Sequence, residues 1–127
     1  MKVKIKGLKK MTNGRWLNLF DVNYTARTGE KKSWQVVTRQ KEPKCVSGDY
    51  RRPDAVVIVP YHAVENKMII LREYRVPLNG YEYGFPAGLV DSGESVERAT
   101  RRELMEETGL TVRRFIKISP PIYSSAG

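Results

Sequence analysis

Residues 88–110 have the sequence GLVDSGESVERATRRELMEETGL, and this stretch decides the fold of the second half of the chain. Within it, Ser95 is a good helix N-cap, and Gly109 suits the left-handed position that follows a helix. The thirteen residues between them predict one helix with a length of about 20 Å.

Three acidic residues of this helix share one face. Glu103, Glu106 and Glu107 have the spacing i, i+3, i+4. Val96 and Ala99 fall on the same arc, so we expect the acids to point into a cleft and not into bulk water. Geometry alone leaves two interpretations open: a metal site, or a charged surface helix held by i, i+4 ion pairs.

The chemistry of the ligand atoms narrows the metal interpretation. Three neighbouring carboxylates repel one another unless a cation lies between them. Oxygen ligands select a hard cation such as Mg²⁺, which keeps several waters and completes its shell with phosphate oxygens. A metal site here therefore indicates a phosphorylated substrate.

Length and composition set the broad class. The chain has 127 residues, 40% of them hydrophobic and 29% charged, which is typical of one globular domain. It has no stretch approaching the roughly 18 apolar residues of a membrane span, and its N-terminus lacks the apolar centre of a signal peptide. Cys45 is the single cysteine, which excludes an intramolecular disulfide. We expect a cytoplasmic protein with no membrane partner.

The positive charge is confined to the first part of the chain. Residues 1–52 hold 14 Lys or Arg against 4 Asp or Glu, whereas residues 53–127 hold 9 against 10. Three interpretations are open: a nucleic-acid arm, a lysine-rich sheet edge that resists aggregation, or basic groups that attract a phosphorylated small molecule. Because the lysines alternate with Val3, Ile5 and Leu8, we favour the sheet edge, and nucleic acid is not the expected partner.

The hydrophobic pattern predicts two parts. Residues 1–50 are expected to form an antiparallel β subdomain, with an alternating face from Trp16 to Tyr24 and a returning strand from Ser33 to Arg39. A loop from Lys41 to Pro53 marks the boundary. Residues 51–127 form the second domain.

Four further segments of the second domain carry expectations. The apolar runs 54–61 and 68–71 predict strands that are buried on both faces. The segment 74–93, rich in Gly, Pro and Tyr, predicts a long functional loop, and 111–118 predicts another strand.

The segment 88–110 resembles the Nudix box, whose pattern is G-x5-E-x7-R-E-U-x-E-E-x-G-U with U a bulky aliphatic residue. Every fixed position is met, from Gly88 and Glu94 to Gly109 and Leu110. A looser similarity to the ADP-ribose pyrophosphatases of that superfamily extends over most of the chain. Its marks are the segments EYRVP at 73–77, FPAG at 85–88 and YSSAG at 123–127.

The resemblance implies a role for each matched position. Glu103, Glu106 and Glu107 would bind Mg²⁺ or Mn²⁺, joined by the backbone carbonyl of Ala87 and by Glu94 at the loop–helix junction. Arg102 would hold a box glutamate in place by a charge-assisted hydrogen bond. The implied catalytic group is therefore Arg102, Glu103, Glu106 and Glu107.

Three residues outside the box are candidates for substrate contact. Arg75 would contact a phosphate or a base, with a surface ion pair as the alternative. Trp34 would stack on an adenine, with a place in the core as the alternative. Arg39 is the third candidate.

The resemblance also implies the architecture and the reaction. The fold would be α+β: an α/β/α Nudix sandwich after the N-terminal antiparallel β subdomain, incomplete at its C-terminus. The general base would lie beyond residue 127, and the β subdomain would support a homodimer. The implied reaction is Mg²⁺-dependent hydrolysis of a nucleoside diphosphate sugar, chiefly ADP-ribose to AMP and ribose 5-phosphate. The alternatives are a non-catalytic nucleotide-binding module and an RNA pyrophosphohydrolase.

Overall fold

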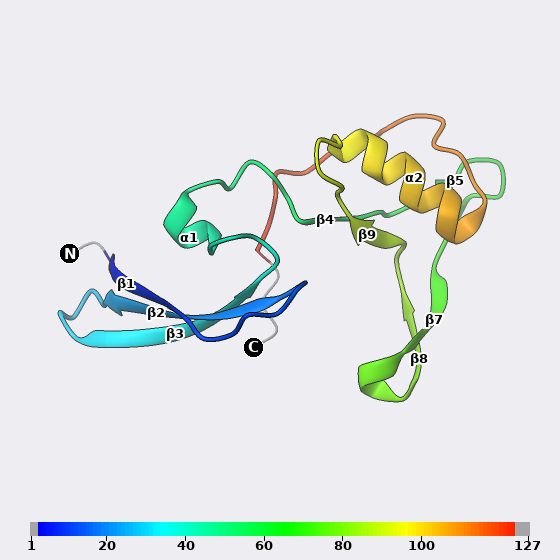
Figure 1. Ribbon diagram of the computed structural model, residues 1–127. Coiled ribbons are helices and arrows are strands. Elements are labelled where there is room, and N and C mark those ends of the chain that lie inside the picture. Colours follow the sequence, from blue (N-terminus) through cyan, green and yellow to red (C-terminus); the bar gives the residue numbers. More distant parts are fainter. Residues whose placement is uncertain (1–2, 124–127) are drawn as a thin grey trace. The chain divides into compact units, whose positions relative to one another are not determined.

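The protein is described by a computed structural model that covers residues 3–123. The chain divides into two compact units, Met1–Arg51 and Arg52–Gly127. The first unit holds a three-stranded antiparallel sheet, and the second combines short antiparallel strands with one long helix, so the class is mixed α+β (Figure 1).

The sheet of the first unit has the order β1-β2-β3. Its strands are β1 (Lys4–Lys10), β2 (Asn18–Thr25) and β3 (Lys31–Thr38), and both pairings are antiparallel. The expected alternation is confirmed in β2, where Phe20 and Val22 are buried. Trp16 precedes β2 and is exposed, so the alternating face is shorter than expected. The chain turns between β2 and β3 at Gly29, whose φ of 89° suits glycine.

The expected loop after this sheet contains a short helix. Helix α1 spans Lys44–Ser47 and ends at Gly48, whose φ of 74° is left-handed. Pro43 precedes the helix and is fully buried. The prediction of a plain loop from Lys41 to Pro53 is therefore wrong: proline before the first turn and glycine after it delimit a helix of one turn.

The described residues of the second unit, 52–123, form three antiparallel strand pairs. Strand β4 (Ala55–Val57) pairs with β9 (Ala87–Leu89), although 29 residues of chain lie between their facing ends, Val57 and Ala87. The other two pairs are local hairpins, β5 (Tyr61–His62) with β6 (Lys67–Met68), and β7 (Leu71–Arg75) with β8 (Gly80–Gly84).

The hairpin of β7 and β8 corrects the expectation of a long loop over 74–93. A short 3₁₀ helix, η1 (Val76–Leu78), connects the two strands, and Asn79 turns the chain with a φ of 47°. Tyr74 and Tyr81 face each other across the pair, with ring centroids 5.5 Å apart in an edge-to-face arrangement. Cross-strand aromatic pairs of this kind stabilise a hairpin, which the content of Gly and Pro concealed.

Helix α2 spans Val96–Thr108 and confirms the expected limits. The Ser95 hydroxyl accepts a hydrogen bond from the Arg98 N–H, and Gly109 has a φ of 72° and donates to the Met105 carbonyl. The buried face of α2 packs on β4 and β9. The core residues are Val56, Ile58, Ala99 and Leu104, with Val90, Val96, Leu110 and Val112 partly buried around them.

The strand expected over 54–61 is buried on one face only. Val56 and Ile58 are buried beneath α2, whereas Val57 and Val59 are 71% and 62% exposed. In residues 3–123 a single helical layer packs on this pair of strands, so the continuous apolar run does not become a doubly buried strand.

Two other strand predictions are wrong for related reasons. The run 68–71 is broken between β6 and β7, and Met68 and Ile70 are exposed. Residues 111–118 follow an irregular path, because the described part of the chain offers them no neighbouring strand. Val112 instead packs on the core, and its carbonyl accepts a hydrogen bond from Arg101 at 2.7 Å. Within residues 3–123, no helix has both the length and the apolar character needed to cross a membrane.

The packing of α2 gives a direct test of this core. Leu104 is 5% exposed, whereas its neighbour Met105 is 44% exposed. We expect Leu104→Ala to lower the free energy of unfolding by about 2–5 kcal/mol, because it leaves a cavity under the helix. Met105→Ala should change it by less than about 0.5 kcal/mol. Urea denaturation followed by far-UV circular dichroism measures both, since the helical signal comes mostly from α2. Equal losses in the two variants would contradict the packing described.

Candidate metal and phosphate site

The acidic stripe of α2 lies beside strand β9 and the loop that follows it. The Glu103 side chain is 12% exposed. Glu106 is the most open of the three acids, at 58% exposed. Glu107 is partly buried and accepts a hydrogen bond from the backbone N–H of Ala87 at 3.1 Å. Glu103 and Glu107 therefore lie against strand β9, whereas Glu106 is open to solvent.

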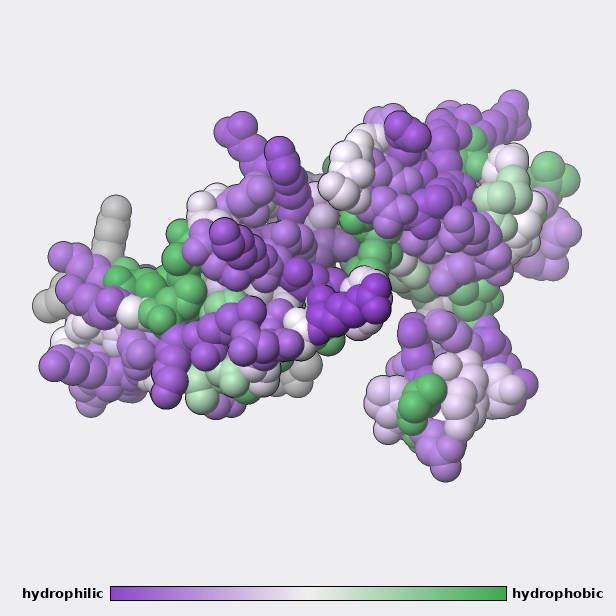
Figure 2. Space-filling model, viewed as in Figure 1, coloured by the Kyte–Doolittle hydropathy of each residue, from purple (hydrophilic) through white to green (hydrophobic). Residues whose placement is uncertain are grey.

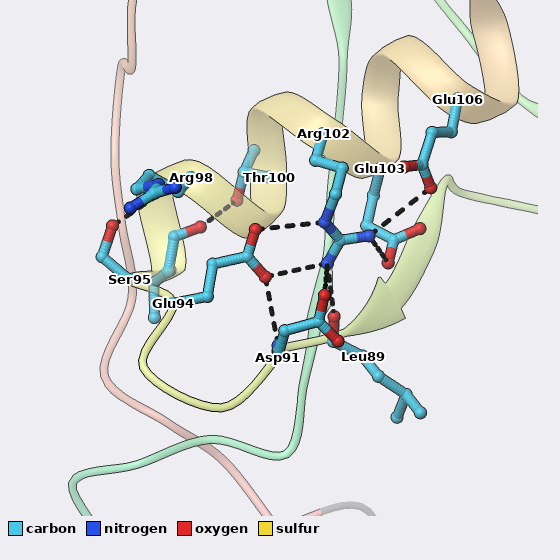
Figure 3. A network of polar contacts seen from close by, with 10 residues as sticks. Leu89, Asp91, Glu94, Ser95, Arg98, Thr100, Arg102, Glu103 and Glu106 are labelled. Atoms are coloured by element: carbon cyan, nitrogen blue, oxygen red, sulfur yellow. Dashed lines mark hydrogen bonds and ion pairs between the residues drawn. The ribbon is translucent and has the colours of Figure 1, made fainter.

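Arg102 is the centre of the network (Figure 3). Its guanidinium donates to Glu94 through both Nε and Nη2, at 3.1 and 2.8 Å, and to Glu103 through Nη1 at 2.7 Å. A longer contact of 3.4 Å reaches Glu106. Nη2 also donates to the backbone carbonyl of Leu89 at 2.9 Å. One planar cation thus ties the helix to the loop and to the end of β9.

Glu94 is held from two sides. Its carboxylate accepts the fork of hydrogen bonds from Arg102 and a further bond from the backbone N–H of Asp91 at 3.1 Å. The hydrogen bonds from Arg102 are the largest cause that lowers the pKa of Glu94 below its usual 4.5, and the Asp91 N–H adds to this. The same carboxylate and that of Glu103 raise the pKa of Arg102 further above its ordinary value, so both partners stay charged.

Gly88 provides the space that Glu103 occupies. A Cβ built at this glycine would overlap the Glu103 carboxylate. Gly88 lies in β9 and does not have a positive φ, so it is not a turn residue. Its function here is close approach: the missing side chain lets a charged group from the helix settle on the strand. The motif includes a glycine at this position, but the need for glycine becomes clear only from the contact with Glu103 in the folded chain.

The donor atoms suit a hard divalent cation. They are carboxylate oxygens from one helical face, gathered above a strand. In residues 3–123, however, no three His, Cys, Asp or Glu side chains are arranged as a ready cluster of metal ligands. The reason is visible in the contacts, because Arg102 and the Ala87 N–H engage the carboxylates that a cation would use. The assignment of Ala87, Glu94, Glu103, Glu106 and Glu107 as metal ligands stays a prediction.

The three substrate candidates belong to other elements than α2, β9 and the loop between them. Arg75 ends β7 and forms ion pairs with Glu73 at 3.0 Å and Glu82 at 3.8 Å. Trp34 lies on β3 and is 54% exposed, so it is not a core residue. Arg39 is exposed just after β3. Trp34 and Arg39 belong to the first unit, and their roles stay predictions.

Comparisons with known proteins identify a family and several relatives. The model of the NUDIX domain family matches residues 51–126. ADP-sugar pyrophosphatase of Mus musculus is 32% identical over 102 residues, which cover 78% of this chain and 44% of that protein. ADP-ribose pyrophosphatase of Saccharomyces cerevisiae is 26% identical over 126 residues, covering 98% of this chain and 53% of that protein. A crystal structure of an ADP compounds hydrolase matches with a TM-score of 0.65 and 30% identity, over 90% of this chain and 55% of that chain.

The chain belongs to the Nudix family, because the family model covers more than half of it. The relatives named above are hydrolases or pyrophosphatases of ADP compounds. The chain spans about half the length of these relatives.

The close approach of Glu103 to Gly88 gives a prediction with a matched control in β8, the strand that precedes β9 in the chain. Gly88→Ala should displace Glu103 or shift β9, at a cost of about 1–3 kcal/mol in the free energy of unfolding. Gly84→Ala adds the same methyl group in β8, where a Cβ meets nothing within 4 Å, and should change the stability by less than about 0.5 kcal/mol. Urea denaturation followed by circular dichroism compares the two. A Gly88→Ala protein as stable as Gly84→Ala would show that the contact is not formed.

The Glu94–Arg102 pair predicts a dependence of stability on pH. Because the folded pKa of Glu94 is lowered, its stabilisation is fully present above the usual value of 4.5 and is lost as the pH falls through the folded pKa. In metal-free buffer, the melting temperature of the parent chain should exceed that of Glu94→Gln above pH 4.5, and the gap should close in more acidic buffer.

Glu65→Gln is the control for this measurement. It removes an exposed carboxylate, which pairs with Lys67 at 3.3 Å, and should give only a small gap at every pH. A Glu94→Gln gap that stayed constant down to acidic pH would contradict the pairing.

Proposed function

We propose that this chain is the part of a Nudix pyrophosphohydrolase that hydrolyses a nucleoside diphosphate sugar, with ADP-ribose as its main substrate. Water adds to one phosphorus of the diphosphate, and the bond from that phosphorus to the bridging oxygen breaks. The products from ADP-ribose are AMP and ribose 5-phosphate. The observation that carries the proposal is the close approach of the Glu103 carboxylate to Gly88, together with the hydrogen bonds from Arg102 to Glu94 and Glu103. These contacts hold the acidic residues of the motif beside β9.

The substrate class is supported by the relatives and by the donor set. The named relatives act on ADP-ribose, ADP-sugars or ADP compounds, as their descriptions state. Carboxylates on one helical face select a hard cation, and the phosphate oxygens of a substrate complete the coordination shell of Mg²⁺. Both lines of support indicate a diphosphate that lies beside α2.

Each residue of the network has a distinct task in this proposal. Glu103, Glu106 and Glu107 hold Mg²⁺, or Mn²⁺ in its place, with help from the carbonyl of Ala87 and from Glu94. When bound, the metal polarises the phosphoryl group and lowers the pKa of a coordinated water. Arg102 is a positioning residue, since its hydrogen bonds orient Glu103 and fix the loop through Glu94. Glu106, the most exposed of the acids, is the one most free to turn toward an incoming cation.

The remaining parts of the proposal lie outside the network. Arg75 contacts a phosphate or the base, Trp34 stacks on the adenine, and Arg39 adds a positive charge. We also propose that a further layer covers the exposed face of Val57 and Val59 to give the α/β/α sandwich. The homodimer and the cytoplasmic location stay predictions.

Glu106→Gln tests the proposed function on the helix itself. Removing one carboxylate should lower the turnover of ADP-ribose by at least about a hundredfold, because a charge that stabilises the metal is lost. The fold should persist, since Glu106 is 58% exposed. Glu97→Gln is the control, because Glu97 is an exposed carboxylate in the first turn of the same helix. Its turnover should stay within about twofold of the parent.

The measurement is product formation with Mg²⁺ in excess, on this chain and on a longer one that includes the segment after residue 127. Equal turnover by Glu106→Gln and the parent would refute the role of the stripe. Tight nucleotide binding without turnover in the longer chain would favour the non-catalytic module instead.

A further inference from the structure

The first unit carries all of the net charge of the chain. Residues 1–51 hold 13 Lys or Arg against 4 Asp or Glu, which is the full +9, and residues 52–127 are balanced. Hydrophilic side chains spread over the visible surface of the molecule, with apolar patches between them (Figure 2). Among the cations of the first unit, the function proposed above uses Arg39, and its metal-binding residues lie in the second unit.

The lysines gather around a cavity at one end of the β1-β2-β3 sheet. The cavity has a volume of about 620 Å³. Its lining residues are Lys6, Asn23, Tyr24, Thr25, Lys31, Lys32 and Ser33.

The register explains how these side chains come together. Lys4, Thr25 and Lys31 form one row across the three strands, and Gly7, Asn23 and Ser33 form the next. Side chains alternate along β2, so Asn23 and Thr25 point to the face opposite the buried Phe20 and Val22. Lys6 falls at an irregularity in the pairing between Ile5 and Gly7.

The chemistry of the lining suits phosphate oxygens. The Asn23 amide and the hydroxyls of Thr25 and Ser33 supply hydrogen-bond donors on one face of the sheet, where Lys31 pairs with Thr25. Lys6 and Lys32 also line the cavity, although Lys32 pairs with Tyr24 and belongs to the opposite face of β3. Lys32 pairs with Glu30 at 3.0 Å, but both side chains are more than half exposed, so this pair competes only weakly with an anion. In residues 3–123, Lys6 and Lys31 have no carboxylate within ion-pair distance.

The row of lysines along β1 is long enough to contact more than one phosphate group. Strand β1 continues from Lys4 through Lys9 to Lys10, a distance of about 20 Å at roughly 3.3 Å per residue. Lysines on a sheet edge also oppose aggregation, which explains their exposure. That explanation does not account for the polar residues Asn23 and Thr25, which lie in the central strand.

From this arrangement we infer that the β1-β2-β3 sheet binds the phosphate backbone of a single-stranded nucleic acid, with one phosphate in the cavity and others along β1. Lysines act as point charges without base readout, so binding depends on the backbone and not on sequence. The inference does not depend on the proposed hydrolysis, whose metal-binding residues belong to the second unit.

The test measures binding of a fluorescently labelled oligonucleotide of twelve uridines by anisotropy. The logarithm of the binding constant should fall linearly with the logarithm of salt concentration. The three cavity lysines contribute about −2 to this slope, and the lysines along β1 make it steeper. The triple variant Lys6→Gln, Lys31→Gln, Lys32→Gln should bind at least about tenfold more weakly at low salt, and its slope should be flatter by about 2.

The matched control removes the same charge from the second unit. Arg113→Gln, Arg114→Gln, Lys117→Gln changes three exposed cations and should stay within about twofold of the parent. Asn23→Asp is the second variant; it places a carboxylate in the cavity with little change of shape and should weaken binding several-fold. Both tryptophans, Trp16 and Trp34, lie in the first unit, so their fluorescence verifies that this unit is folded in each variant.

Three results would overturn the inference. The first is no binding of the oligonucleotide by the parent chain at low salt. The second is an equal loss in the two triple variants, which would show that only net charge matters. The third is binding of tripolyphosphate but not of the oligonucleotide, which would assign the cavity to a small phosphorylated molecule.

Discussion

The hydrogen bonds from Arg102 to Glu94 and Glu103 are the interaction on which the site depends. Carboxylates packed side by side repel one another, and the guanidinium offsets this repulsion while it joins three segments of the chain. These hydrogen bonds can form because Gly88 leaves room for the Glu103 carboxylate and because the Asp91 N–H holds the Glu94 carboxylate in place. The helix, the strand and the loop are therefore held in one fixed arrangement.

Local signals made much of this predictable from the sequence. The N-cap Ser95 and the following Gly109 gave the limits of α2, and the i, i+3, i+4 spacing placed the acids on one face. The resemblance to the Nudix box also anticipated that Arg102 would hold a box glutamate. These features depend on residues close in sequence, where capping and helical periodicity decide the outcome.

The predictions that were wrong concern features that depend on contacts between distant segments of the chain. The apolar run 54–61 cannot reveal how many layers will cover it, so the exposure of Val57 and Val59 was not foreseen. The strand expected over 111–118 has no neighbour in the described part of the chain. The close approach of Glu103 to Gly88 joins residues 15 positions apart and required the fold itself. The cavity of the first unit likewise follows from the register of three strands.

The most direct test of whether the acids of α2 bind a divalent cation is titration of the chain with Mn²⁺ in the presence of a non-hydrolysable nucleoside diphosphate. Electron paramagnetic resonance reports the bound ion. We predict that the parent binds Mn²⁺ and that the triple variant Glu103→Gln, Glu106→Gln, Glu107→Gln loses at least about a hundredfold in affinity. Mn²⁺ binding of equal strength by the triple variant would contradict it.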